Sequence, residues 1–203
     1  MIAEAVRRSA LADYADRFAA LTASHRGELF IRELPFLSHV NLRVDPKDTG
    51  LMQRLAAAIG LALPVVPNTV ATGEDRRALW LGPDEWLLVG PDGQQEALEQ
   101  ALRSGLNGTL GSIVDVSVNR TLLEIRGAKA RDLLGHGVAI DLDARSFGAS
   151  RCAQTLLAKA QVIIEGRDES SFHVYARTSF ASYVAGWLLD AAADPYLMAR
   201  GNE

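Results

Sequence analysis

The chain has 203 residues, 48% of them hydrophobic and 23% charged, which is enough to bury one or two compact cores. Its 21 Lys and Arg against 25 Asp and Glu give a formal net charge of −4, without the basic footprint that nucleic-acid binding requires. The single cysteine, Cys152, cannot form an internal disulfide, and four scattered histidines make no metal cluster with it. These numbers predict a soluble globular protein of a reducing compartment, with few reactive side chains.

Residues 1–18 carry a charge every few positions, and no apolar run in the chain approaches the roughly 18–20 residues of a membrane span. We therefore expect a cytoplasmic protein with no membrane association. Residues 1–28 form an N-terminal arm in which apolar side chains recur at three- and four-residue steps, as in an amphipathic helix ending at Gly27. Such an arm either folds back onto its own domain or lies on a partner.

Residues 29–118 are expected to form a first β-α-β-β-α-β unit. After a strand at 28–34, the alternation of residues 39–44 predicts a half-buried strand. Asp45 as N-cap and Pro46 in the first turn would open a helix that ends at Gly60. The remaining elements are strands at 77–81 and 86–89, joined by a four-residue turn, a helix at 94–106 and a strand at 113–117.

Residues 119–203 are expected to form a second β-α-β-β-α unit with a C-terminal tail. Its predicted elements are a strand at 121–126, a helix at 128–134, strands at 155–165 and 171–177, and a helix at 180–191. In the strand 171–177, His173 lies on the polar face, where we expect it to be solvated. The fold class is therefore α+β, with two consecutive ferredoxin-like split β-α-β units whose antiparallel sheets are covered by helices.

The chain offers no clear catalytic, cofactor or metal motif. Cys152 has no local nucleophile signature, so an inert small side chain is expected and a catalytic thiol is the alternative. Asp84 suits a turn, because Asp side chains bond nearby backbone amides there. Asp115 precedes Arg120 by five residues, which favours a structural Asp115–Arg120 pair or a buried polar tie between the halves over catalysis.

Residues 81–88 (LGPDEWLL) and 114–120 (VDVSVNR) resemble the gamma subunit of heterotetrameric sarcosine oxidase. The resemblance covers roughly residues 75–192. Its family-motif and interface candidates are Trp80, Gly82, Pro83, Asp84, Glu85, Trp86, Asp115, Ser117 and Arg120. Core packing is the alternative role for the two tryptophans, since interfaces and cores both favour aromatic side chains.

The resemblance implies a fold similar to the folate-binding domain of the glycine-cleavage T-protein. It also implies a non-catalytic subunit of a complex that demethylates sarcosine to glycine, passes the one-carbon unit to tetrahydrofolate and produces hydrogen peroxide. FAD, FMN, NAD, tetrahydrofolate and zinc would be held by the alpha, beta and delta subunits and none by this chain. The alternatives are a free-standing tetrahydrofolate-binding protein or aminomethyltransferase-like enzyme of the same fold, and an adaptor for another amine oxidase.

Overall fold

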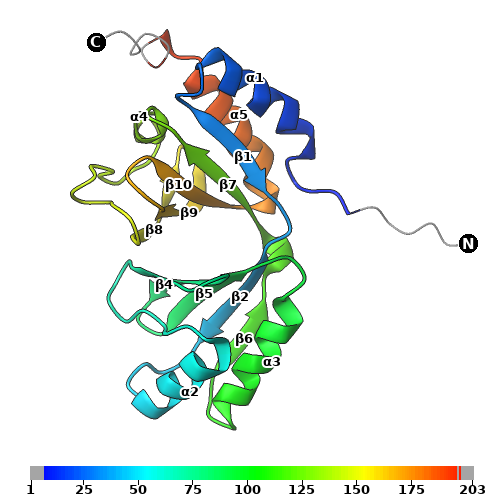
Figure 1. The fold of residues 1–203 in the computed structure, drawn as a ribbon, viewed down its shortest axis with the longest axis vertical. Coiled ribbons are helices and arrows are strands. Elements are labelled where there is room, and N and C mark those ends of the chain that lie inside the picture. Colours follow the sequence, from blue (N-terminus) through cyan, green and yellow to red (C-terminus); the bar gives the residue numbers. More distant parts are fainter. Residues whose placement is uncertain (1–6, 196, 198–203) are drawn as a thin grey trace, which may run out of the picture.

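The computed structural model describes residues 7–195 and 197, and shows two five-stranded sheets stacked face to face between two outer layers of helices (Figure 1). Sheet I has the strand order β1-β7-β10-β9-β8, and sheet II has the order β3-β4-β5-β2-β6. Every strand pair is antiparallel. The predicted α+β class with antiparallel, helix-covered sheets is confirmed.

Sheet II and its helices come from the first half of the chain. The elements are β2 (Ser38–Arg43), α2 (Thr49–Ile59), β3 (Val70–Thr72), β4 (Arg77–Gly82), β5 (Glu85–Gly90), α3 (Gln95–Leu106) and β6 (Ser112–Asp115). The helices α2 and α3 bury Leu51, Leu55, Leu98 and Leu102 against the outer face of this sheet. The short strand β3 was not anticipated from the sequence.

Helix α2 begins three residues later than predicted. Its N-cap is Asp48, whose Oδ1 accepts a hydrogen bond of 2.8 Å from the backbone N–H of Leu51. Asp45 instead accepts from the backbone N–H of Lys47 and stabilises the turn before the helix. The predicted end at Gly60 is confirmed, since this residue takes the left-handed conformation that glycine favours (φ 67°).

Sheet I and its helices are drawn mostly from the second half. The elements are α1 (Ala15–Ser24), β1 (Phe30–Leu34), β7 (Arg120–Arg126), α4 (Ala130–Gly135), β8 (Cys152–Leu157), β9 (Ala160–Gly166), β10 (Ser171–Arg177) and α5 (Ala181–Ala192). The single strand predicted over 155–165 is wrong, because β8 and β9 form a hairpin that turns at Ala158 (φ 52°). Because β9 is buried on both faces, its sequence is mostly apolar on both faces. The sequence therefore contains no polar segment from which the turn could be predicted.

The strand predicted at 28–34 was placed with residues 29–118, ahead of the β-α-β-β-α-β order that runs from Val40 onward, but as β1 it pairs with β7 in sheet I. With β1 in this place, the order β1-β7-β10-β9-β8 repeats the order β6-β2-β5-β4-β3 position by position. The second unit, which lacks a last strand in the sequence, receives that strand from the N-terminal part of the chain. Sheet II therefore begins at β2 and not at residue 29.

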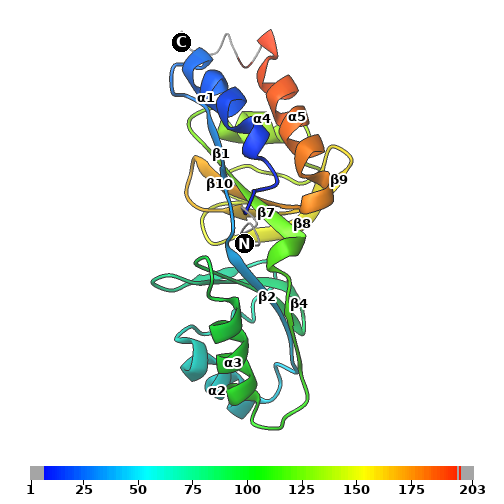
Figure 2. The same cartoon turned by 90° about the vertical axis from the view of Figure 1, so that its right-hand side faces the viewer.

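The N-terminal arm folds back onto its own chain. Helix α1 buries Phe18 and Leu21 against sheet I and lies beside α5, where His25 Nε2 is 3.0 Å from the carbonyl oxygen of Ala192 (Figure 2). This outcome is one of the two that the sequence left open. Residues 1–6 of the arm, and residues 196 and 198–203 of the predicted tail, lie outside the described residues.

Candidate functional site

The inner faces of the two sheets enclose a small apolar cluster with a polar group beside it. The cluster contains Val70, Leu79, Leu87 and Val89 from sheet II and Leu122, Cys152, Ile163 and Tyr175 from sheet I. Among these residues Tyr175 is fully buried, although its hydroxyl needs a hydrogen-bond partner. That partner is supplied by the polar group.

Glu165 on β9 is the centre of the polar group and is completely buried. The Tyr175 hydroxyl donates to its Oε2 at 2.6 Å, and Arg167 Nη1 donates to its Oε1 at 2.7 Å. Arg77 crosses from sheet II: its Nη2 donates to the Tyr175 oxygen at 3.3 Å, and its Nε lies 3.5 Å from Glu165 Oε1. The group therefore ties the two sheets together.

The pKa values of Glu165 and Tyr175 fit a structural role for this polar group. Burial by itself raises the pKa of Glu165, but the contacts with His173, Arg77 and Tyr175 outweigh it and lower that pKa to about 2. Burial and the Glu165 carboxylate raise the pKa of Tyr175 well above its usual value. Near neutral pH the carboxyl is ionised and the phenol is protonated, so neither is poised for general acid–base catalysis.

Two histidines border the same group. The side chain of His39 on β2 is 1% exposed, its ring lies edge-on to Tyr175, and neither ring nitrogen has a hydrogen-bond partner in the described structure. Burial is the main reason that the pKa of His39 is lowered to about 4. His173 lies 3.4 Å from Glu165 Oε2 and is buried, so the predicted solvated position is wrong. The polar face of β10 packs against sheet II rather than facing water.

Cys152 begins β8 and is 1% exposed, with its Sγ 3.4 Å from the carbonyl oxygen of Trp80. Burial raises the pKa of this thiol to about 12. A thiol in this state has almost no thiolate near neutral pH and no access to a substrate. The environment supports the inert role expected from the sequence.

The motif residues of the β4–β5 turn form a tightly packed hairpin. Trp86 is fully buried and its indole N–H donates to the carbonyl oxygen of Pro64 at 2.7 Å. Trp80 packs against the same apolar core as Trp86, between sheet II and the helices α2 and α3. Trp86 therefore belongs to the core, whereas Trp80 is only partly buried. At the tip, Pro83 and Asp84 make the turn between Gly82, the last residue of β4, and Glu85, the first of β5.

The two acidic residues of this turn are bound to strand β2. Asp84 pairs with Arg43 at 2.9 Å, and Glu85 accepts a hydrogen bond of 2.8 Å from Asn41 Nδ2. The partners of both acidic residues lie on β2, which is next to β5 in the sheet. The hairpin signal in the sequence is therefore a structural one, and Pro83 at its tip is exposed.

Asp115 and Ser117 lie where the chain passes from β6 of sheet II to β7 of sheet I. Asp115 Oδ1 accepts from the backbone N–H and the hydroxyl of Ser117, and Ser117 Oγ accepts from the backbone N–H of His39 at 3.0 Å. In the described residues no ion pair joins Asp115 to Arg120, so the predicted pair is wrong. The alternative, a buried polar tie between the halves, does not describe this arrangement either, because Asp115 is exposed, and both Ser117 and His39 belong to the same half as Asp115.

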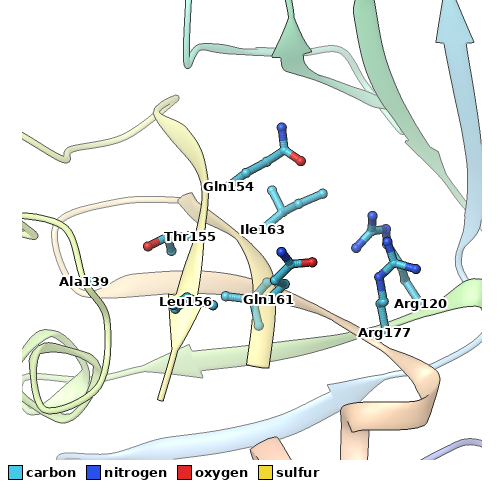
Figure 3. Close-up of a pocket in the computed structure, with 9 residues that line it drawn as sticks. Arg120, Ala139, Gln154, Thr155, Leu156, Gln161, Ile163 and Arg177 are labelled. Atoms are coloured by element: carbon cyan, nitrogen blue, oxygen red, sulfur yellow. The ribbon is translucent and has the colours of Figure 1, made fainter. Parts of the chain in front are cut away.

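Arg120 lies instead in a pocket of about 360 Å³ at the open end of the space between the sheets (Figure 3). Its cross-strand partner is Arg177, and the two side chains stand side by side in a pocket that Gln154 and Gln161 also line. Arg177 and Glu165 were not singled out from the sequence. The alternation of polar residues along 171–177 could have indicated that Arg177 shares a face with His173 and Tyr175. It could not have indicated what packs against that face.

The chain was compared with known proteins. The sarcosine oxidase gamma subunit family matches residues 43–194. This chain belongs to that family. Curated gamma subunits from Arthrobacter sp. and Corynebacterium sp. (strain P-1) are 36% and 35% identical to it over 190 residues, covering 93% of this chain and 91% of each relative.

Two solved structures extend the comparison. A chain of the heterotetrameric sarcosine oxidase from Corynebacterium sp. U-96, in complex with pyrrole 2-carboxylate, matches with a TM-score of 0.82 and 35% identity. The match covers 92% of this chain and 94% of that one. The glycine cleavage aminomethyltransferase T from Bartonella henselae matches with a TM-score of 0.61 at 14% identity, over 83% of this chain and 48% of that one. The T-protein-like fold implied by the sequence is therefore confirmed.

Residues 7–195 and 197 contain neither a metal-binding cluster nor a membrane-spanning helix. No group of three or more His, Cys, Asp or Glu side chains in this part is arranged to hold a metal ion. No helix in the same part has the length and apolar character needed to cross a membrane.

Proposed function

We propose that this protein is the gamma subunit of a heterotetrameric sarcosine oxidase, an oxidoreductase complex, and that it is not itself catalytic. The observation that carries the proposal is the likeness over nearly the whole chain to gamma subunits and to a chain of the heterotetrameric enzyme. Because the similarity extends over both sheets, it supports the same role for the whole chain as for those subunits.

The state of the buried polar groups supports a non-catalytic role. Glu165 is ionised and enclosed, and Cys152 is a buried thiol whose raised pKa leaves it unreactive. A catalytic group must touch substrate or cofactor, which these enclosed side chains cannot do. The chain would contribute to the complex by packing against other subunits.

In this proposal the complex demethylates sarcosine to glycine in the cytoplasm, transfers the one-carbon unit to tetrahydrofolate and forms hydrogen peroxide. FAD, FMN, NAD, tetrahydrofolate and zinc belong to the alpha, beta and delta subunits. Because Trp86 is in the core, the contact candidates around the β4–β5 turn are the partly exposed Trp80 and the tip of the turn. Pro83 is exposed there and Asp84 is half exposed.

Affinity co-purification of the tagged chain from its native cell tests the proposal. We expect three further subunits to be recovered, with flavin absorbance and sarcosine-dependent hydrogen peroxide formation in the complex. The isolated chain should be colourless and inactive. Recovery of a lone monomer without flavoprotein, or sarcosine turnover by the isolated chain, would overturn the proposal.

Calorimetry of the isolated chain with tetrahydrofolate separates the second candidate, a free-standing folate-binding protein. The likeness to aminomethyltransferase T shows the fold alone, so we expect no micromolar binding. Micromolar affinity would favour the free-standing protein.

A further inference from the structure

The pair Arg120 and Arg177 is distinctive for its lack of a counter-ion. The two residues face each other across β7 and β10, and both side chains line the same pocket. In the described structure neither guanidinium makes an ion pair or a hydrogen bond. Several arginines in or next to the sheets do have acidic partners, as Arg77 and Arg167 have Glu165 and Arg43 has Asp84. Arg126 on β7 stacks on the ring of Phe30 instead.

Two adjacent guanidinium groups repel each other, and arginine does not give up its proton to relieve the repulsion. Burial and the charge of Arg177 both lower the pKa of Arg120, while Glu85 across the opening acts in the opposite direction. Arg120 is partly buried, so water screens this repulsion incompletely. An anion placed between the two side chains would remove the unfavourable interaction.

The pocket suits a carboxylate group. Its volume of about 360 Å³ accommodates a short side chain, and two guanidinium groups offer the planar pairs of donors that match carboxylate oxygens. Gln154 and Gln161 also line the pocket, where Gln154 Nε2 donates to the carbonyl oxygen of Leu81 at 2.8 Å. Leu156 and Ile163 supply apolar walls (Figure 3). A chain of net charge −4 with only two cations in the pocket is a poor match for a phosphate polymer.

The surroundings of the pocket resemble a protein interface. Leu156 on its rim is 43% exposed, and Phe180, three residues after Arg177, is also 43% exposed. Arg120 also lines a neighbouring pocket of about 430 Å³, whose wall includes Val118 at 91% exposure. Arginine surrounded by exposed apolar and aromatic side chains is characteristic of subunit contacts.

We propose that Arg120 and Arg177 dock an acidic side chain of a partner subunit, with Gln154, Gln161, Leu156 and Val118 completing the contact. This inference rests on the proposed function, because it requires the chain to be a subunit. Strand pairing holds the two arginines in place before assembly. The arginines are positioned for binding and take no part in chemistry.

The test uses Arg120→Gln, Arg177→Gln and the double variant, each co-expressed with the partner subunits. Each single substitution should weaken assembly by at least about tenfold, because the partner's carboxylate would lose a charged donor in a desolvated site. The melting temperature of the isolated chain should stay the same or rise, because the repulsion is removed. A purely structural role would lower melting temperature and assembly together.

The matched control is Arg126→Gln, at the other end of β7, where the guanidinium stacks on Phe30. This variant should assemble like the wild type. If the wild type recovers no partner, the proposed function fails. If the wild type assembles and the double variant assembles equally well, only the present inference is overturned.

A third arm distinguishes a small-molecule site. Acetate and inorganic phosphate are titrated into the isolated wild-type chain while its melting temperature is recorded. We expect no saturable shift at millimolar concentrations. Saturable stabilisation that is lost in the double variant, together with unchanged assembly of that variant, would overturn the docking proposal in favour of a small-anion site.

Discussion

The two sheets are built to the same plan from differently arranged pieces of chain. In sheet II the last strand, β6, follows α3 directly, whereas in sheet I the same position is filled by β1 from the N-terminal part. Each edge strand pairs antiparallel with the first strand of its unit, β2 or β7. Position in a sheet is therefore independent of position in the chain, provided that a strand of the right pattern can reach the open edge.

The two sheets share a strand order, but the side chains on their inner faces differ. Sheet II contributes mainly apolar side chains together with Arg77 and His39, while sheet I contributes Glu165, Tyr175 and the arginine pair. The buried charge is thus unevenly divided, with the acid on one sheet and one of its cations on the other. The following variants separate what each sheet contributes.

The largest effect is expected when the acid is removed from sheet I. Glu165→Leu leaves Arg167 and the Tyr175 hydroxyl without their acceptor, and Arg77 without its ion-pair partner. Removal of one partner from a buried ionic group costs about 3–5 kcal/mol, which we expect as the loss in free energy of unfolding by urea. The control Glu99→Gln, in an exposed helix pair with Arg103, should cost less than about 0.5 kcal/mol. A loss below about 1 kcal/mol for Glu165→Leu would show that the tie contributes little.

The equivalence of the edge strands is tested by a pair of substitutions. Ile31 on β1 is 1% exposed and Ile113 on β6 is 7% exposed, and each packs against the helices of its own sheet. Ile31→Ala and Ile113→Ala should each cost about 3 kcal/mol in urea unfolding, from lost apolar burial and the cavity left behind. A cost below about 1 kcal/mol for Ile31→Ala alone would contradict the view that β1 completes sheet I as β6 completes sheet II.

The buried histidine of sheet II should make stability depend on pH. The pKa of His39 is about 4 in the folded protein and near 6.5 when exposed, so between these values the unfolded chain binds the extra proton. Stability should therefore fall by about 2 kcal/mol as the pH decreases from 7 to 5. His39→Phe should flatten this part of the profile.

For this pH profile the control is His136→Gln, since His136 is exposed and its replacement should leave the slope unchanged. Unfolding by urea at pH 7, 6 and 5 gives the measurement. If wild type and His39→Phe have the same slope, another group is responsible for the pH dependence.

The smallest effect on stability is expected at the tip of the β4–β5 turn. Asp84 and Arg43 are both about half exposed, so Asp84→Ala should change the free energy of unfolding by less than about 0.5 kcal/mol. Under the proposed function, the same variant should weaken assembly with the partner subunits. Unchanged stability together with unchanged assembly would remove this turn from the interface.

Much of the local structure could be predicted from the sequence. The hairpin around Gly82–Glu85, the helix end at Gly60 and the periodicity of α5 depend on neighbouring residues, and the structure confirms them. The family motif also depends on local strings, and it led to the correct family and fold. The N-cap at Asp48 was missed because two acidic residues three positions apart, Asp45 and Asp48, both suited the role.

The tertiary structure decided which strand completes each sheet and what covers each face. Alternation along β10 predicts two faces, but it cannot tell that His173 and Tyr175 meet a second sheet while Arg177 stands at its open end. The same limit applies to Glu165, whose partners Arg77 and Tyr175 are 88 and 10 residues away in the chain. Local patterns report how much burial a side chain requires, whereas its partners depend on contacts between distant segments, and these exist only once the two sheets have packed.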